Sequence, residues 1–338
     1  MAEFRTPVKT KCSHLIDSNL YSNPIEIPAS PFLQQIGHGT GVDILKFERS
    51  PSVGFVKSPW AIKKRNKKFC GGKDYDNRLE FEAKLLKKLN HPNIVGFRAF
   101  TLSSKGDPCL AMEQLDISLG DLIESKVDKG DNIFPAKDIL YVAYEMAKGL
   151  DYLHNTMHIL HGDMKSFNVL VSNDLKKVKL CDFGVSVPLT ETLELKDTKF
   201  RYVGTECWSA PEVLETGPIT DKCDIWSYGL ILWEMIALSP PHVYYDPNEL
   251  QNNTEDEESL SLKVESDIED QSLDDSSSFF FKMEKKFGTR PPLPAINLGV
   301  EYENVLDIFY TCTCNDYKLR PSAKGLLNYF SVCKLIKV

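Results

Sequence analysis

Apolar residues in the first third of the chain fall into short runs separated by turns, a pattern typical of strands. Strands are predicted over residues 36–47 (two strands joined by a glycine turn), 60–63, 94–101 and 109–113, with a hairpin loop at 50–59. Residues 77–90 instead carry leucines at helical spacing and end before His91-Pro92, where proline disfavours further helix. This part of the chain is therefore predicted to be mostly strands with one helix.

From Leu115 onward the spacing of apolar residues becomes helical. Residues 135–154 carry one amphipathic stripe, made of Ile139, Val142, Ala143, Met146, Leu150 and Leu153. Residues 225–238 are apolar on nearly every side, which predicts a buried helix, and a last helix is predicted over 323–330. Two short strands, 169–171 and 178–181, lie between these helices.

Composition narrows the class of protein. The 338 residues are 42% hydrophobic and 26% charged, as in an ordinary soluble globular protein, and no apolar run reaches the roughly 18 residues of a membrane span. The N-terminal residues lack an apolar signal core. The nine cysteines show no zinc-site spacing, which favours reduced thiols. We therefore expect an intracellular protein, cytoplasmic or nuclear, that does not bind a membrane.

The acidic charge is confined to one segment. Residues 246–278 hold twelve acidic residues and one lysine, a local net charge of −11, whereas the whole chain carries −8 and the remainder therefore +3. This charge predicts a disordered insertion, which is either a plain solvated loop or a segment that recruits or repels substrates. Residues 1–31 are polar and aperiodic and predict a flexible tail. Nothing in the distribution of charge indicates nucleic-acid binding.

Residues 161–184 carry the strongest candidate chemistry. HGDMKSFN is followed by a short apolar run and CDFG, which places Asn168 five residues after Asp163 and Asp182 fourteen residues after Asn168. A phosphoryl-transfer site needs a carboxylate that accepts a hydroxyl proton, as Asp163 could, and oxygen ligands for Mg²⁺, as Asn168 and Asp182 could provide. It also uses a lysine, here Lys165, which lies between Asp163 and Asn168 in the sequence.

Weaker features precede this block. The glycines of GHGTG would let backbone N–H groups approach phosphate oxygens, although glycine clusters are more often plain turns. Lys63 follows in WAIK, and Glu82, nineteen residues later on the predicted helix, can pair with it. Each of these charges alone is more often solvated. Their order ahead of HGDMKSFN and CDFG favours a nucleotide-phosphate site.

With these motifs in this order, the chain resembles the eukaryotic protein kinases over about residues 32–335. GTECWSAPE (204–212) is similar to the end of an activation segment, DIWSYG (224–229) to the helix beneath the catalytic loop, and Arg320 to the arginine that pairs with Glu212. The resemblance implies an α+β, bilobal fold. A β-rich N-lobe with one control helix (about 32–113) and a mostly helical C-lobe (about 116–335) would hold ATP between them.

CDFGVS resembles the MAP kinase kinases, and other segments narrow the resemblance to one kinase of mitotic or proliferative signalling. These segments are IPASPF, GHGTGV, SPWAIKK, EAKLLKKLNHPNIVGFRAF, HGDMKS and GTRPP. The resemblance implies an ATP- and Mg²⁺-dependent kinase of protein substrates. The DxKxxN setting of Lys165 resembles serine/threonine kinases, and dual specificity stays open.

The resemblance also implies a role for each matched residue. Asp163 would orient the substrate hydroxyl and accept its proton, and Lys165 would neutralise charge on the transferring phosphate. Lys63, held by Glu82, would contact the α- and β-phosphates, and Asn168 and Asp182 would hold Mg²⁺. The glycine loop would be Ile36, Gly37, His38, Gly39, Thr40 and Gly41, and the adenine would contact Ile44, Ala61, Met112, Glu113, Leu115 and Leu170. An apolar spine joining the lobes would consist of Leu86, Phe97, His161 and Phe183.

Two positions depart from the family pattern. Val42 stands where a third loop glycine is expected, and Gly162 replaces the arginine that in many kinases pairs with an activation-loop phosphate. These departures leave open a catalytically weak pseudokinase, or a scaffold that acts through the acidic segment and the C-terminal tail. The presence of Lys63, Asp163 and Asp182 favours an active enzyme.

Short features indicate further partners. Thr6, in the sequence Thr-Pro-Val-Lys, resembles a site for cyclin-dependent kinases. Residues 336–338 are an apolar C-terminal tail of the kind that PDZ domains bind, although a frayed helix end has the same character. Because Gly162 cannot form the arginine–phosphate pair, activation through tail phosphorylation, a partner or a homodimer is an alternative to activation-loop phosphorylation.

Overall fold

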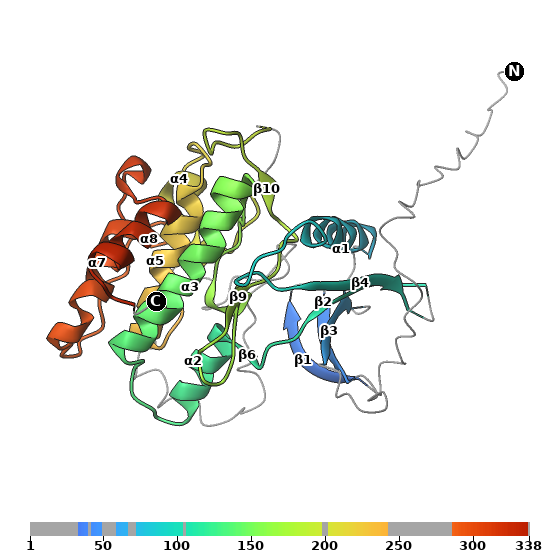
Figure 1. Ribbon diagram of the computed structural model, residues 1–338, viewed down its shortest axis with the longest axis horizontal. Coiled ribbons are helices and arrows are strands. Elements are labelled where there is room, and N and C mark those ends of the chain that lie inside the picture. The colour runs from blue at the N-terminus through green and yellow to red at the C-terminus, as the bar shows by residue number, and fades with distance from the viewer. Residues whose placement is uncertain are drawn as a thin grey trace, which may run out of the picture.

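A computed structural model of the chain has a smaller lobe built on a β-sheet and a larger lobe built of helices (Figure 1). The structure describes residues 33–39, 42–48, 59–66, 72–103, 106–197, 202–242 and 286–336. The predicted tail at 1–31 with Thr6, nearly all of the loop at 50–59, the acidic segment at 246–278 and the last two residues lie outside the described residues. Thr40 and Gly41 of the glycine loop lie outside them as well.

The smaller lobe holds five antiparallel strands in the order β1-β2-β3-β5-β4. They are β1 (Gln34–Gly39), β2 (Val42–Phe47), β3 (Trp60–Arg65), β4 (Phe97–Leu102) and β5 (Pro108–Glu113). Leu110 and Met112 of β5 pack in one cluster with Leu86 of α1 (Gly72–Leu86), whereas Cys109 and Ala111 belong to a second cluster. Because successive strand residues point to opposite faces, burial of both faces explains why β5 is continuously apolar.

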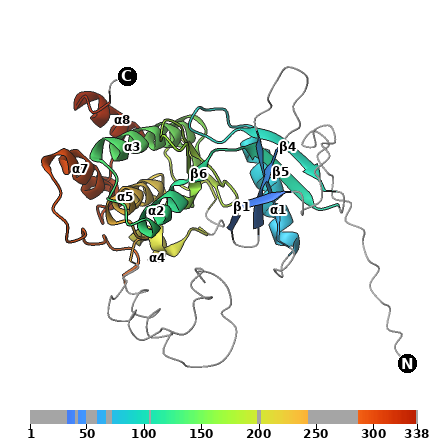
Figure 2. The same cartoon turned by 90° about the horizontal axis from the view of Figure 1, so that it is seen from below.

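The larger lobe packs its helices around α5 (Lys222–Ala237), which is buried from Cys223 to Ile236. Helix α3 (Ala136–Asp151) packs against α5, α7 (Glu303–Cys312) and α8 (Ala323–Val332), and α2 (Leu119–Asp128) and α4 (Pro211–Leu214) belong to the same lobe (Figures 1 and 2). Among its described residues, this lobe also has two small sheets: β6 (Ile117–Ser118), β8 (Val169–Val171) and β9 (Val178–Leu180) form one, and β7 (Ile159–Leu160) and β10 (Val187–Pro188) form the other. Within the described residues, no helix has the length and apolar character needed to span a membrane.

The α+β, bilobal architecture is confirmed, but several predicted boundaries, including the two described below, are wrong by up to five residues. The helix predicted at 77–90 is α1, which begins at Gly72 and ends at Leu86. The strand predicted at 94–101 begins at Phe97, because residues 93–95 pair with β9. The Val95 N–H donates to the Leu180 carbonyl (3.0 Å), and the Leu180 N–H donates to the Asn93 carbonyl (2.8 Å). These two bonds join the segment before β4 to the larger lobe.

Candidate active site

Lys63 connects three elements at the boundary between the lobes. Its Nζ atom lies 2.9 Å from Oε2 of Glu82 in α1 and 2.8 Å from Oδ1 of Asp182, which stands two residues after β9. β3 is paired on both sides, with β2 and with β5, so the backbone of Lys63 is fixed. The side chains of Lys63 and Glu82 are buried, whereas that of Asp182 is 38% exposed. The predicted Lys63–Glu82 pair is therefore present, and the Asp182 carboxylate stays accessible.

The charges of this group depend on one another. Burial acts to lower the pKa of Lys63, but the carboxylates of Asp182 and Glu82 outweigh it and raise that pKa above the ordinary lysine value. Burial acts to raise the pKa of Asp182, but the adjacent Lys63 ammonium lowers it to about 2. Burial dominates at Glu82 and raises the pKa of its carboxyl. Lys63 is therefore a cation at neutral pH, and Asp182 is an anion.

Both carboxylate oxygens of Asp163 have partners. Oδ1 accepts from the N–H (3.0 Å) and the hydroxyl (2.7 Å) of Thr205. Oδ2 accepts from the Asn168 amide (3.0 Å) and lies 3.3 Å from the Lys165 ammonium. Lys165 also donates to the Thr205 hydroxyl (2.8 Å). Asp163, Lys165 and Asn168 are therefore brought together as predicted, and Thr205, which was not predicted as a site residue, joins them.

The side-chain orientation of Asn168 follows from its partners. Its amide donates to the backbone carbonyl (2.7 Å) and to Oδ2 (3.0 Å) of Asp163. Both partners are acceptors, so the bonded atom is the NH₂ group and the amide oxygen remains as an acceptor. This oxygen and the carboxylate of Asp182 are hard ligands, and Mg²⁺ in nucleotide sites takes one or two such groups together with waters and phosphate oxygens. The donor set therefore fits Mg²⁺.

Asp224 of α5 holds the beginning of the loop formed by residues 161–168. Its Oδ2 accepts from the His161 N–H (2.8 Å) and from Nε2 of His154 (2.8 Å), and its Oδ1 accepts from the Gly162 N–H (3.0 Å). Burial acts to raise the pKa of Asp224, but these donors lower it below the ordinary value. A carboxylate buried in α5 therefore fixes the backbone just ahead of Asp163.

Two residues of the site have left-handed backbones. Gly162 has φ of +81°, and a Cβ atom there would lie 3.1 Å from the Val185 carbonyl oxygen. Asp182 has φ of +64° without being glycine, a conformation that persists only where surrounding contacts impose it. Here the salt bridge to Lys63 fixes the side chain of Asp182, and the next residue, Phe183, is fully buried.

The predicted spine residues lie close together. The rings of His161 and Phe183 have centroids 5.0 Å apart, and His161 Nε2 bonds the Cys181 carbonyl (3.0 Å). Leu86 and Phe183 are buried in the same core cluster, and Phe97 packs against it. This cluster spans both lobes, because Leu86 belongs to α1 and Phe183 to the segment after β9.

The residues predicted to contact adenine lie mainly on one side of the small-lobe sheet. Ala61 faces Met112 across the β3–β5 pair, both are buried, and Ile44 and Leu170 pack against their cluster. The Glu113 N–H donates to the Gly96 carbonyl (2.8 Å), and the Glu113 carboxylate lies 3.2 Å from the Lys179 ammonium.

The remaining predicted contacts of the nucleotide lie at the margins of the described residues. Leu115 follows β5 and is partly buried, and Ile36 is exposed in β1. Of the glycine loop, Gly37, His38 and Gly39 form the end of β1 and pair with β2.

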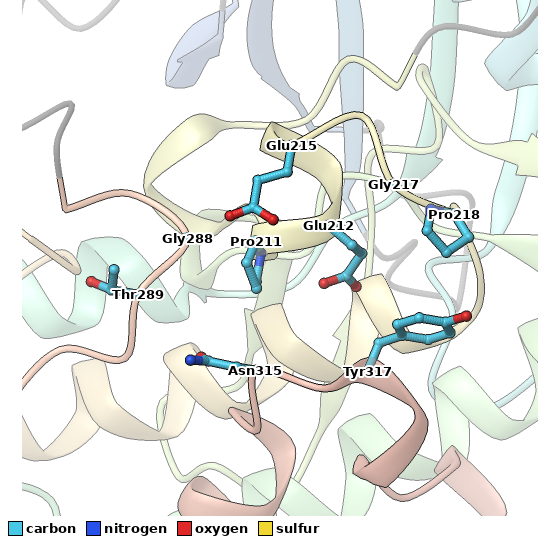
Figure 3. A pocket seen from close by; sticks show the side chains of 9 residues that line it. All are labelled: Pro211, Glu212, Glu215, Gly217, Pro218, Gly288, Thr289, Asn315 and Tyr317. Carbon is cyan, nitrogen blue, oxygen red and sulfur yellow. The ribbon is translucent and has the colours of Figure 1, made fainter.

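A cavity of about 430 Å³ lies elsewhere, beneath α4 (Figure 3). Its lining includes Glu212, Gly288, Asn315 and Tyr317 but none of the residues around Lys63. Glu212 is already engaged there, because both of its oxygens accept from the guanidinium of Arg320 (2.7 and 2.8 Å). The predicted Arg320–Glu212 pair is thus present, and this cavity borders a structural ion pair.

Comparison with known proteins agrees with this geometry. Residues 32–330 match the protein kinase domain. The chain belongs to the protein kinase family. It is 45% identical to human lymphokine-activated killer T-cell-originated protein kinase over 333 residues, which cover 97% of each chain. This match confirms the narrower resemblance, to that one kinase, which IPASPF, HGDMKS and GTRPP indicated.

Other relatives match over less of their length. The chain is 36% identical to the probable serine/threonine-protein kinase drkC of Dictyostelium discoideum over 221 residues, 65% of this chain and 28% of that protein. It is 37% identical to mouse mitogen-activated protein kinase kinase kinase 13 over 164 residues, 48% of this chain and 16% of that protein. The chain is thus an enzyme of the protein kinase type, and its resemblance to MAP kinase kinases in particular stays a prediction.

Proposed function

We propose that this protein kinase transfers the terminal phosphoryl group of ATP, with Mg²⁺, to serine or threonine hydroxyls of protein substrates. The observation that carries the proposal is the contact of Lys63 with both Glu82 and Asp182, next to a loop in which Asp163, Lys165 and Asn168 are hydrogen-bonded together. In phosphoryl transfer the protein contributes mostly positioning and electrostatic stabilisation. A pre-formed set of charges is therefore what the reaction requires.

Each residue has a distinct task in this proposal. Asp163 orients the substrate hydroxyl and accepts its proton as the new P–O bond forms. Lys165, a cation beside Asp163, balances charge on the transferring group, and Lys63 binds the α- and β-phosphates. Asn168 and Asp182 hold Mg²⁺, which when bound neutralises phosphate charge.

The adenine is proposed to lie against Ile44, Ala61, Met112 and Leu170. The glycine loop, residues 36–41, covers the phosphates. Backbone groups of Glu113 and Leu115 bond the adenine edge. Because the Glu113 N–H already donates to Gly96, the Glu113 carbonyl and the backbone of Leu115 are the groups assigned to this contact.

The decisive experiment follows phosphate transfer from labelled ATP to a peptide array with purified protein. Wild type is expected to label serine or threonine peptides only with Mg²⁺ present. Lys63→Met and Asp182→Asn are expected to lose transfer although they remain folded at the assay temperature, which a thermal melt checks, and Lys64→Met, the next residue of β3, serves as the matched control. Activity in Asp182→Asn equal to wild type would contradict the metal assignment. An inactive wild type would favour the pseudokinase or scaffold alternative, and labelled tyrosine peptides would support dual specificity.

We further infer that activation depends little on a phosphate in the activation segment. The segment after Asp182 has contacts that need no phosphate: Ser186 donates to the His161 carbonyl (2.8 Å), and the Leu189 N–H donates to the His158 carbonyl (2.7 Å). Gly162, at the position of the phosphate-binding arginine, has no side chain. Regulation is assigned instead to phosphorylation of Thr6, to a homodimer or to a PDZ partner at 336–338, in mitotic or proliferative signalling. Phosphorylation confined to residues 190–205 that raised turnover by orders of magnitude would refute this inference.

A further inference from the structure

A small apolar cluster lies against the segment that follows Asp182, and we call it the segment cluster. Its buried core and the partly buried residues packed on that core are Leu160, Val187, Leu189 and Cys223, and Leu193, Leu195, Tyr202, Val213 and Ile219. The four buried residues belong to no other apolar cluster of the described chain. Most members lie between positions 187 and 202, so apolar packing holds this segment.

Backbone hydrogen bonds hold the first half of the segment as well. The Leu189 N–H donates to the His158 carbonyl (2.7 Å), and the Leu195 N–H donates to the Ile219 carbonyl (3.0 Å). These bonds tie residues 187–195 to β7 on one side and to the chain ahead of α5 on the other. The first half of the segment is therefore ordered by neutral contacts.

Tyr202 connects the second half of the segment to the same cluster. Its partly buried ring packs on the segment cluster and also lies over the backbone of Gly204, where a Cβ atom would be 2.8 Å from Cζ of the ring. A side chain at Gly204 would thus displace the ring. The next residue, Thr205, bonds the Asp163 carboxylate through its N–H and its hydroxyl. The Tyr202 ring is therefore three residues from a direct contact of Asp163.

The surroundings of the Tyr202 hydroxyl favour a neutral group. Burial raises the pKa of this phenol well above its ordinary value. The neighbouring acidic groups of Cys223, Asp224 and Asp163 raise the pKa further. Position 162, where many kinases carry an arginine, is Gly162 and supplies no positive charge. An aromatic ring fits this end of the segment, whereas an added negative charge would be repelled by the carboxylates.

We propose that Tyr202 is a positioning residue for phosphoryl transfer, whose ring takes the place of a phosphate–arginine pair in the activation segment. Seated between the segment cluster and Gly204, the ring fixes the backbone at Thr205 and so the orientation of the Asp163 carboxylate. The inference rests on the proposed function. It adds which side chain orders the segment without a phosphate, and it adds a sign: negative charge at position 202 lowers activity.

The test compares three variants at position 202 with wild type at a temperature where all of them are folded. Tyr202→Ala removes the ring, Tyr202→Phe keeps the ring without its hydroxyl, and Tyr202→Glu introduces a negative charge. Tyr317→Ala is the matched control, because it removes another partly buried tyrosine ring that lies between α7 and α8, outside the segment cluster. The readouts are kcat and KM for a substrate peptide, KM for ATP, and hydrogen exchange of the backbone amides of residues 187–195.

Tyr202→Ala and Tyr202→Glu are expected to lose about 10-fold to 100-fold in kcat/KM for the peptide, the cost typical of a small misplacement of reacting groups. Their amides at 187–195 should exchange faster than in wild type. KM for ATP should stay unchanged, because neither Lys63 nor Asp182 belongs to the segment cluster as far as the structure describes it. Tyr202→Phe and Tyr317→Ala should match wild type in every readout.

Other outcomes contradict the proposal. If Tyr202→Ala keeps the wild-type kcat/KM and only melts earlier, the ring merely stabilises the fold. If Tyr202→Phe is as impaired as Tyr202→Ala, the hydroxyl matters and the apolar packing does not. If Tyr317→Ala is equally impaired, or KM for ATP rises as much as peptide turnover falls, the loss is not specific to the segment. Higher turnover in Tyr202→Glu would show that the segment responds to negative charge.

Failure of the proposed function is distinguishable from failure of this inference. A wild type without any phosphate transfer would show that the proposed function is wrong. Hydrogen exchange at 187–195 then still tests the role of the ring, since it needs no activity: faster exchange in Tyr202→Ala than in Tyr202→Phe supports that role, and equal exchange refutes it.

Discussion

Each side chain at the centre of the site contacts more than one partner. Lys63 binds two carboxylates that lie on different elements, and the two oxygens of Asp163 bind Thr205, Asn168 and Lys165. Each side chain is therefore held in one orientation before any substrate arrives, which is the pre-organisation that electrostatic catalysis needs. Backbone conformation adds to this at Gly162, where only a residue without Cβ adopts φ of +81° without strain.

The backbone conformation at position 162 predicts how a substitution of Gly162 changes the stability of the protein. A left-handed backbone costs a residue with a Cβ roughly 1–2 kcal/mol, and at position 162 the new Cβ also meets the Val185 carbonyl at 3.1 Å. Gly130 has φ of +64°, and apart from its chain neighbours no heavy atom of the described residues lies within 4 Å of the place that a Cβ would take, so it isolates the backbone effect. Gly162→Ala is therefore expected to lower the unfolding midpoint in a thermal melt more than Gly130→Ala does. Equal losses in the two variants would show that the close approach of Val185 has no energetic consequence.

At the scale of elements, α5 determines where the catalytic residues lie. Its apolar side chains are buried all round, while its polar face binds the loop 161–168 at both ends, through Asp224 and Glu234. A helix that is fixed by the surrounding core is a more rigid support than the loop itself. The loop of the candidate active site is thus hydrogen-bonded to a helix that is buried from Cys223 to Ile236.

The raised pKa of Glu234 predicts a pH dependence of stability. The carboxyl has a pKa of about 8 in the folded protein and an ordinary value of 4.5 when unfolded. Between these values the folded state binds more protons, so stability falls as pH rises. The contribution is complete below about 4.5 and is lost as pH rises through about 8. In urea denaturation across this range, wild type is expected to lose stability relative to Glu234→Gln, whose side chain does not titrate. Parallel profiles for the two proteins would contradict the raised pKa.

Most features that the sequence predicted depend on residues close together in the chain, whereas most of those that it missed depend on contacts between residues far apart in the chain. The helix around 225–238 was predicted because its apolar character is local, and Asp163, Asn168 and Asp182 were found because their motifs are contiguous. Helix α7 was missed, although it buries Val305, Ile308, Phe309 and Cys312 at helical spacing. Glu234 had no local signal, and Thr205 appeared only as one residue of GTECWSAPE, since the two meet Ser166 and Asp163 across 68 and 42 residues. Such contacts follow from the tertiary fold and not from any window of sequence.

At the scale of the whole molecule, the two lobes are joined through the same residues that are proposed to bind the nucleotide. Lys63 and Glu82 belong to the smaller lobe and Asp182 to the larger one. The backbone pairing of Asn93 and Val95 with Leu180 adds a second connection close by. Within the larger lobe, the ion pair between Arg320 and Glu212 joins two residues that are 108 positions apart in the sequence. Ligand binding at Lys63 and Asp182 is therefore expected to stabilise the assembly of both lobes.

This coupling predicts a metal-dependent thermal shift. A ligand that binds only the folded state stabilises it by about 2.7 kcal/mol at a concentration 100 times its Kd. A non-hydrolysable ATP analogue should raise the unfolding midpoint of wild type, and Mg²⁺ should raise it further, because Asn168 and Asp182 then hold the ion against the phosphates. Asp182→Asn should lose the Mg²⁺-dependent increment. Asp174→Asn is the matched control, because it removes the same charge from the turn between β8 and β9, where Asp174 bonds Ser172 and lies 3.0 Å from the Lys176 ammonium. An increment that persists in Asp182→Asn, or disappears in Asp174→Asn as well, would place the metal elsewhere.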